Sequence, residues 1–449
     1  MLTGIVLCFV IGYLTIVFEH PLRLDKSVPA LAMGALCWAL IAIGHVDVLD
    51  HHHELGSIED VMLHHIGKTA EILVFLLGAM TIVELVDLHR GFSVITDFIK
   101  TRNKRKMLWI ISIMAFFLSA VLDNLTCTIV FVSLLRRLIP DKEERLWFIC
   151  FVVVAANAGG AWSPIGDVTT TMLWIGKKVT TPELIINLFI PSVICLVVPI
   201  LIAQFFQPFK GEISLPEATS LQPNEAQKRK LLSSKTMLFA GIGGLIFVPI
   251  FKSITHLPPY AGMMLSLSIV WLISEYIHPE EDFKEEAKER YSARHALSRI
   301  EMSSIIFFLG ILMGVAALES AVVMGLDGHP IGLLGKLAQN LEAAIPNQDY
   351  VIILLGFLSA VIDNVPLVAA SMGMYSMEAF PVDSKLWHFI AYSAGTGGSM
   401  LIIGSAAGVA AMGMERINFI WYLRKFAWLA LIGFLAGALS FLLLHPFLP

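Results

Sequence analysis

The sequence carries little charge. Only 15% of its 449 residues are Asp, Glu, Lys or Arg, whereas 57% are hydrophobic. Together with a mean hydropathy of +0.77, this is too apolar for a soluble domain and indicates an all-α polytopic membrane protein. The formal net charge of −5 is small and spread over loops, so we expect no nucleic-acid partner and membrane lipid as the surroundings.

Cofactor and nucleotide motifs are absent as well. The five cysteines all lie within apolar runs and lack the spacing of a metal or disulfide framework. No GxxxxGK[ST] loop occurs, so we expect transport driven by ion gradients and not by ATP. We therefore expect neither an enzyme nor a cofactor.

Apolar runs predict the membrane-spanning helices. The first run lacks the charged lead and cleavage site of a signal peptide, so we keep it as a helix. The runs are 2–18, 28–44, 69–86, 183–206, 234–251, 258–277, 301–318 and 419–445. Basic clusters at 100–106, 136–137, 228–230 and 284–299 predict the cytoplasmic side, which leaves 45–68 and both termini outside.

One polar motif occurs twice. Residues 117–128 read FLSAVLDNLTCT, and a matching FLSAVIDNVPLV begins at Phe357. Each copy has an Asp-Asn pair in an apolar run, with no lysine or arginine close by in sequence. Because a carboxylate at membrane depth costs a few kcal/mol, both pairs are candidate functional sites of a transporter.

The runs around each Asp-Asn pair are too short to span. Arms of about 16 and 14 residues cannot cross a core of about 30 Å at 1.5 Å per residue. We therefore predict re-entrant helical hairpins at 107–138 and 350–379, with the polar tips near mid-membrane. Pro366 follows the second pair and suits the start of a helix.

A glycine-rich segment follows each hairpin. Residues 157–167 read NAGGAWSPIGD and residues 395–405 read GTGGSMLIIGS. Glycine and proline break a helix and expose its carbonyls and N-terminus. We predict broken helices at 146–176 and 386–414.

These features predict five parts of the chain. Inverted repeats at 69–182 and 301–418 are preceded by scaffold helices at 1–68 and 183–300, and a C-terminal helix occupies 419–449. Inverted repeats with broken helices at the midplane are typical of alternating-access transporters.

The polar side chains of the tips and breaks form the candidate site. They offer hard oxygen ligands, which suit alkali cations, and lack the cysteine and histidine that transition metals prefer. The set comprises Asp123, Asn124, Thr126, Thr128, Asn157, Ser163, Asp167, Thr169, Thr170, Asp363, Asn364, Thr396, Ser399 and Ser405. Because Ser405 stands where the first break has Asp167, we expect the cation nearer the first half. Na⁺ is expected at Asp123, Asn124, Asn157 and Asp363.

A buried carboxylate without a basic partner favours its protonated form, so it can exchange a proton for a cation. Competition for one carboxylate would couple the two fluxes. For an anion carrier we would expect a lysine or arginine in these segments, or neutral tips.

The runs FLLGAMTIVELVD (75–87), LDNLTCTIV, NAGGAWSPIGDVTT and VIDNVP resemble the NhaD-type sodium/proton antiporters of the ion transporter superfamily. The resemblance covers essentially the whole chain. It implies an elevator-type homodimer in the bacterial inner membrane that exchanges Na⁺ or Li⁺ for H⁺, usually best at alkaline pH. It also implicates the residues above as cation- and proton-binding, apart from Thr128 and Thr396. The dicarboxylate carriers of the superfamily share the layout but have neutral Ser-Asn-Thr tips, so sodium-coupled uptake of an organic anion is the alternative.

Structural alternatives stay open at several positions. Asp123, Asp167 and Asp363 can serve as helix N-caps, and the serines and threonines can bond to their own helices. Glu84 and Glu319 can be proton-path residues or interface carboxylates.

The histidine-rich loop 50–54, with His64 and His65, suggests a metal site or pH sensor. A solvated loop is favoured, because three adjacent histidines lack the spacing of a ligand set. Residues 280–299 predict a cytoplasmic surface helix.

Overall fold

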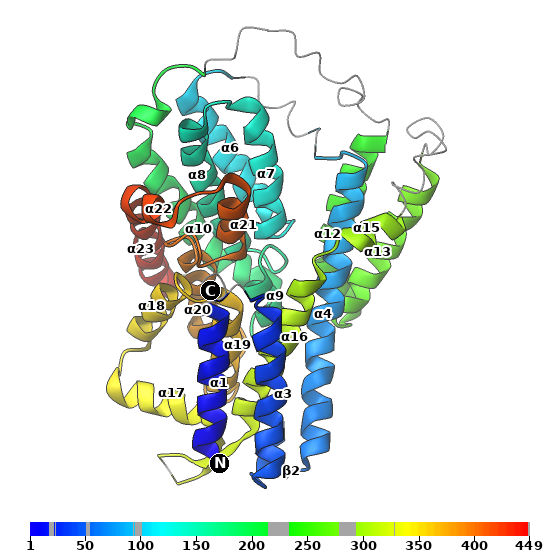
Figure 1. Ribbon diagram of the computed structural model, residues 1–449, viewed down its shortest axis with the longest axis vertical. Coiled ribbons are helices and arrows are strands. Elements are labelled where there is room, and N and C mark those ends of the chain that lie inside the picture. The colour runs from blue at the N-terminus through cyan, green and yellow to red at the C-terminus, as the bar shows by residue number, and fades with distance from the viewer. Residues whose placement is uncertain are drawn as a thin grey trace.

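Helices make up almost all the regular structure (Figure 1). The computed structural model describes residues 1–17, 22, 24–50, 54–92, 94, 101–213, 233–277, 293–326 and 328–447. Two small antiparallel hairpins pair β1 (Val48–Leu49) with β2 (Leu55–Gly56) and β3 (Val322–Met324) with β4 (Pro330–Gly332). A bridge between Val48 and Ala321 brings the two hairpins together.

The helices pack into two bundles (Figure 1). The α3 bundle contains α1 (Leu2–Val17), α3 (Ser27–Ile43), α4 (Ile58–Leu88), α12 (Ser233–Thr255), α13 (Pro259–Tyr276), α15 (Ala293–Arg299) and α16 (Met302–Ser320). The α8 bundle contains α6 (Lys104–Ser119), α7 (Asn124–Leu138), α8 (Lys142–Ala161), α9 (Val168–Ile175), α10 (Thr181–Ala203), α18 (Gln348–Ser359), α19 (Asn364–Met374), α20 (Lys385–Gly397), α21 (Ala406–Glu415), α22 (Phe419–Lys425) and α23 (Ala427–Leu444). The bundles meet where α16 packs on α19 and α4 on α9, and α17 (Leu333–Ala344) contacts both α16 and α19.

This packing groups the helices differently from their order in the chain. The sequence prediction assigns α4 and α16 to the two repeats. In the structure they pack instead beside predicted scaffold helices, α4 on α13 and α16 on α3. The helices α10 and α23 pack on each other and on α20, and α10 also packs on α8. The five-part division along the chain stays a prediction.

Six described helices are long and apolar enough to cross a membrane: α4, α8, α10, α12, α16 and the segment formed by α23 with its continuation to Phe447. The chain is therefore a multi-pass membrane protein. The prediction of one helix at 419–445 is wrong, because the helix breaks at Phe426 and separates α22 from α23. Arg424 and Lys425 end α22 and so stay outside apolar α23. The predicted span 69–86 is the end of α4, which has 31 residues.

Each Asp-Asn pair lies between two short helices, as predicted. The helices α6 and α7 have 16 and 15 residues, or about 24 and 22 Å of helix. The helices α18 and α19 have 12 and 11 residues, or about 18 and 16 Å. All four are shorter than a hydrocarbon core of about 30 Å, which agrees with re-entrant hairpins whose depth in the membrane stays a prediction.

Each predicted broken helix is interrupted by a non-helical segment. The first break separates α8 from α9, and the second separates α20 from α21. In both halves the broken helix touches the preceding hairpin backbone to backbone. A Cβ on Gly159 would lie 2.1 Å from the Phe116 carbonyl oxygen, and one on Gly397 would lie 2.3 Å from that of Gly356.

The same two surfaces share a second contact. Ser119 Oγ donates to the carbonyl of Ala156 at 2.6 Å, and Ser359 Oγ donates to that of Ala394 at 2.8 Å. Each hairpin is thus fixed to its broken helix by the same pair of contacts, a glycine and a serine, in both halves of the chain.

Gly159→Ala should therefore destabilise the protein. Its new methyl group meets a backbone carbonyl that cannot move without shifting α6, so we expect a loss of about 3 kcal/mol, the upper end for overpacking. Thermal unfolding of the purified protein in detergent measures the loss.

Gly413→Ala is the matched control. Gly413 lies in α21, and a Cβ there has nothing within 4 Å. It should unfold at or slightly above the wild-type temperature, because alanine is the better helix former. Equal unfolding temperatures for Gly159→Ala and Gly413→Ala would contradict the packing described.

Candidate functional site

A hydrogen-bonded network, which we call the amide network, links the first hairpin tip to both breaks. Asn124 Nδ2 donates to Asp167 Oδ2 at 2.6 Å and to Asn157 Oδ1 at 3.0 Å. Asn157 Nδ2 donates in turn to Ser399 Oγ at 2.8 Å and to Ser405 Oγ at 2.9 Å. All five side chains are buried, so each contact forms away from bulk solvent.

The second hairpin tip joins the network at Asp167. Asn364 Nδ2 lies 3.5 Å from both carboxylate oxygens of Asp167. Asp167 Oδ1 also accepts from the backbone N–H and the hydroxyl of Thr169, at 2.9 and 2.8 Å. The Asp167 residue is 2% exposed. Hydrogen-bond donors from both tips and from α9 therefore surround one buried carboxylate.

The three aspartates all cap helices. Asp123 caps α7, Asp167 caps α9 and Asp363 caps α19, each accepting from a backbone N–H of the first turn. Ser405 caps α21 in the same way. The capping interpretation is confirmed as geometry. It does not exclude ion binding, because a carboxylate has about four lone-pair sites and a cap uses only one or two of them.

Asp123 lies outside the amide network. Its carboxylate accepts from the backbone N–H of Thr126 at 2.6 Å and from the Thr126 hydroxyl at 2.8 Å. The residue is half-buried, whereas its neighbour Asn124 is buried. The first tip thus directs its amide into the network and keeps its carboxylate on its own helix.

Asp363 has a basic partner that its sequence neighbourhood does not reveal. Lys26 Nζ lies 3.4 Å from Asp363 Oδ2, and the two side chains are 29% and 21% exposed. The expectation that the buried carboxylates lack a basic partner is therefore wrong for Asp363. The only sequence signal is a lysine placed directly before the apolar run that forms α3.

The remaining hydroxyls brace the backbone around the breaks. Ser163 donates to the carbonyl of Ala120, Thr170 to that of Asp167 at 2.9 Å and Thr396 to that of Tyr392 at 2.6 Å. These contacts match the structural alternative for serine and threonine. The Thr128 hydroxyl is buried, and within the described residues it has no hydrogen-bond partner.

The expected sodium ligands are thus only partly brought together. Asn124 and Asn157 are in direct contact, whereas Asp123 and Asp363 bond to their own helices and, for Asp363, to Lys26. The carboxylate at the centre of the network is Asp167, a candidate that was not among the four expected sodium ligands. Over the described ranges, no three His, Cys, Asp or Glu side chains gather into a metal site.

Glu84 is paired with an arginine. Arg299 of α15 contacts Glu84 through Nε at 3.2 Å and Asp87 through Nη2 at 3.1 Å. The pairing fixes α15 to the end of α4.

Residues 280–292 of the predicted surface helix lie outside the described residues, as do 51–53 of the histidine-rich loop.

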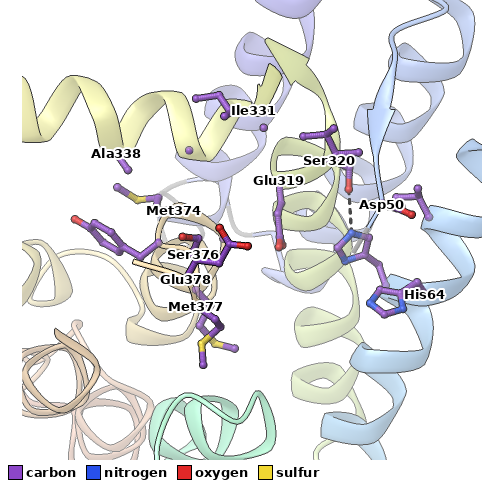
Figure 2. Close-up of a pocket in the computed structure, with 18 of the residues that line it drawn as sticks. Asp50, His64, Glu319, Ser320, Ile331, Ala338, Met374, Ser376, Met377 and Glu378 are labelled. Carbon is purple, nitrogen blue, oxygen red and sulfur yellow. Dashed lines mark hydrogen bonds between the residues drawn. The ribbon is translucent and has the colours of Figure 1, made fainter. Parts of the chain in front are cut away.

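Glu319 lines a cavity of about 1010 Å³ between the bundles (Figure 2). The cavity lies among the start of α4, the end of α16, α17 and the segment after α19. Its charged and imidazole side chains are Asp50, Asp60, His64, His65, Lys68, Lys178, Glu319, Glu342 and Glu378. His65 Nε2 lies 2.9 Å from Ser320 Oγ. One end of α19 reaches this cavity and the other, about 16 Å away, carries Asn364.

Apolar helices with a buried polar network between broken helices are the features of a membrane transporter. The Citrate transporter family (CitMHS) matches residues 13–388. The chain is 45% identical over 441 residues to "Sodium/proton antiporter 2" of Arabidopsis thaliana, covering 98% of this chain and 99% of the relative. It is 44% identical over 443 residues to "Sodium/proton antiporter 1" of the same plant, covering 98% and 72%. It is 30% identical over 466 residues to "Na(+)/H(+) antiporter NhaD" of Vibrio cholerae, covering 98% and 91%.

The chain belongs to the NhaD-type antiporters within the CitMHS family. The family resemblance predicted from the sequence is confirmed. Members of such a family move ions and need no cofactor for it.

Asn157→Ala should destabilise the folded protein. It removes the acceptor of Asn124 and the donor shared by Ser399 and Ser405, which leaves buried polar groups unpaired at a cost of about 1–3 kcal/mol. Thermal unfolding in detergent tests this. Asn187→Ala is the control, because Asn187 is also buried but donates only within α10, to Glu183. An Asn157 variant no less stable than the Asn187 variant would argue against a continuous network.

Proposed function

We propose that the chain exchanges Na⁺ or Li⁺ for H⁺, with cation and proton competing for buried carboxylates. The observation that carries this proposal is the position of Asp167, a buried carboxylate contacted by side chains from both hairpin tips. The relatives at 30–45% identity bear the names of sodium/proton antiporters, which supports the same function.

Competition at Asp167 follows from its burial. In the absence of a proton, its negative charge must be balanced by donors or by a cation, because desolvation disfavours an isolated charge. Asn124 and Asn364 direct N–H groups at the carboxylate. Rotation of either side-chain amide group by about 180° would direct its carbonyl oxygen at the site in place of its N–H. Oxygen is the ligand that hard alkali cations prefer. The same two side chains can therefore serve the cation-free and cation-bound states.

We assign the central role to Asp167 and supporting roles to the aspartates at the tips. Asp123 and Asp363 bring further negative charge beside the network, and each has lone pairs left after capping its helix. The proposed cation- and proton-binding residues are Asp123, Asn124, Thr126, Asn157, Ser163, Asp167, Thr169, Thr170, Asp363, Asn364, Ser399 and Ser405.

The repeated contacts support an internal repeat, and the basic clusters lead us to propose that its two copies are inverted. Gly159 and Gly397 make equivalent backbone contacts, and Ser119 and Ser359 make equivalent hydrogen bonds.

The separation into two bundles is compatible with an elevator mechanism, in which the α8 bundle would carry the ion past the α3 bundle. The homodimer is proposed from the family resemblance alone.

The membrane is also part of the proposal. The relatives come from Vibrio cholerae and from Arabidopsis thaliana, so their origins do not single out the bacterial inner membrane. From the distribution of basic clusters we infer that the cavity of Figure 2 faces the outer side. Its five carboxylates outnumber its two lysines and would raise the local concentration of cations there.

Sodium-coupled uptake of an organic anion is the second candidate. The family's description as citrate transporters favours it, and so does the presence of Lys26 beside the second tip. Against it, the Lys26 ammonium is paired with Asp363, so the pair presents little net positive charge to an anion.

Everted vesicles test the exchange. At pH about 8.5, well above ordinary carboxylate values, added Na⁺ should dissipate an imposed proton gradient. Asp167→Asn should reduce the response to background, because a neutral amide cannot exchange a proton for a cation. Asp349→Asn is the control: Asp349 pairs with Lys385 at 2.7 Å on the second hairpin, away from the network, and its loss should leave exchange intact.

The pH dependence gives a second check. Because protons compete with the cation, the apparent KM for Na⁺ should rise as pH falls, by up to about tenfold per unit for a single competing proton. A KM independent of pH would contradict competition. Uptake of labelled citrate or succinate that needs Na⁺, without proton movement, would instead support the second candidate.

A further inference from the structure

Lys26 is held on the α3 bundle. Ser27 Oγ, next to it in the chain, donates to the carbonyl of Ser303 in α16 at 2.8 Å. The Lys26 ammonium lies 4.6 Å from the ring centroid of Phe307, also in α16, which is a favourable cation–π distance. Both the backbone and the side chain of Lys26 are thus positioned by α16.

Its partner Asp363 belongs to the second hairpin tip. Asp363 caps α19, which packs on α9 and α20 of the α8 bundle as well as on α16. The pair between Lys26 and Asp363 therefore crosses the boundary between the bundles. It does so directly beside Asn364, which contacts Asp167.

Other ionisable groups surround this pair. Asp25 adjoins Lys26, and its carboxylate accepts from the backbone N–H of Ser27 at 2.8 Å. Tyr13 of α1 and Asp167 are further ionisable groups close to Asp363. Lys26 thus brings a full positive charge to a site that also holds the carboxylates of Asp25 and Asp167 and the phenol of Tyr13.

The ion pair requires Asp363 to be ionised and free of cation. A proton on Asp363 would remove its charge, and a bound Na⁺ would take the position opposite it. Ammonium, sodium and proton therefore exclude one another at this carboxylate.

We propose that Lys26 is a tethered competitor of the transported cation, and that it restrains the second tip against the α3 bundle whenever Asp363 is empty. This inference rests on the proposed exchange function. Loading with Na⁺ or H⁺ releases the tip, so loaded carriers move and the empty carrier is held back. Movement of the empty carrier is what uncouples an exchanger, so Lys26 contributes to coupling as a positioning residue.

The expected effects are moderate, because the pair is partly exposed. Ion pairs of this kind shift equilibria by about two- to fivefold. Lys26→Gln should lower the apparent KM for Na⁺ by about that factor, since the ion no longer displaces an ammonium. It should also lower the number of protons moved per Na⁺, because the empty carrier can now return.

Reconstituted full-length protein allows both measurements, with ²²Na⁺ flux and a pH-sensitive dye recorded in the same proteoliposomes. Lys26→Arg keeps the charge and should retain the wild-type proton-to-sodium ratio. Lys385→Gln is the matched control, because it removes a lysine–aspartate pair that joins α20 to α18 of the same hairpin, without touching Asp363. If Lys26→Gln does not reach the membrane, Lys26→Met keeps the aliphatic stem over Phe307 and removes only the charge.

The outcomes separate the two proposals. Wild-type KM and ratio in the neutral Lys26 variants would overturn the competitor role while leaving the exchange function in place. A change in the proton-to-sodium ratio that is as large in Lys26→Arg as in Lys26→Gln would also overturn it. Lys26→Arg keeps the positive charge, so it should restore the wild-type ratio if the charge is responsible. Wild-type protein that does not exchange Na⁺ for H⁺ would overturn the function and this inference together.

Discussion

A negative charge inside an apolar bundle must be balanced by the groups around it. Asp167 meets this requirement with two amides and a threonine, drawn from both hairpin tips and the helix that it caps. The arrangement explains why the tips carry asparagine beside aspartate. The asparagine supplies donors that do not neutralise the carboxylate permanently, so a proton or a cation can still replace them.

The same balance is achieved differently at Asp363. There the compensating group is the ammonium of Lys26, which comes from the other bundle. Asp167 thus depends on groups close to it within the hairpin and broken-helix assembly, whereas Asp363 depends on how the two bundles are placed. The two carboxylates respond to different parts of the structure although Asn364 links their surroundings.

The sequence predicted the features that depend on local composition. Short arms, the Asp-Asn pairs and the glycine-rich segments predicted both hairpins and both breaks, because helix length and polarity are readable over about 15 residues. The break at Phe426, the composition of the bundles and the contact of Lys26 with Asp363 could not be predicted. The bundles and the Lys26 contact depend on packing between segments far apart in the chain, for which a single sequence gives no signal. The break depends on the backbone of one residue, Phe426, which leaves helical geometry inside an apolar run. Asp167 was a candidate from the sequence, but its central position among the candidate residues depends on the same kind of packing.

The backbone contacts at Gly159 and Gly397 have a mechanical consequence. Two main chains in direct contact leave no rotamers to adjust, so each hairpin and its broken helix must behave as one stiff block. The two bundles meet at other surfaces, between α16 and α19 and between α4 and α9. A relative movement of the two bundles, as proposed above, would therefore carry each hairpin together with its broken helix and preserve the spacing between them.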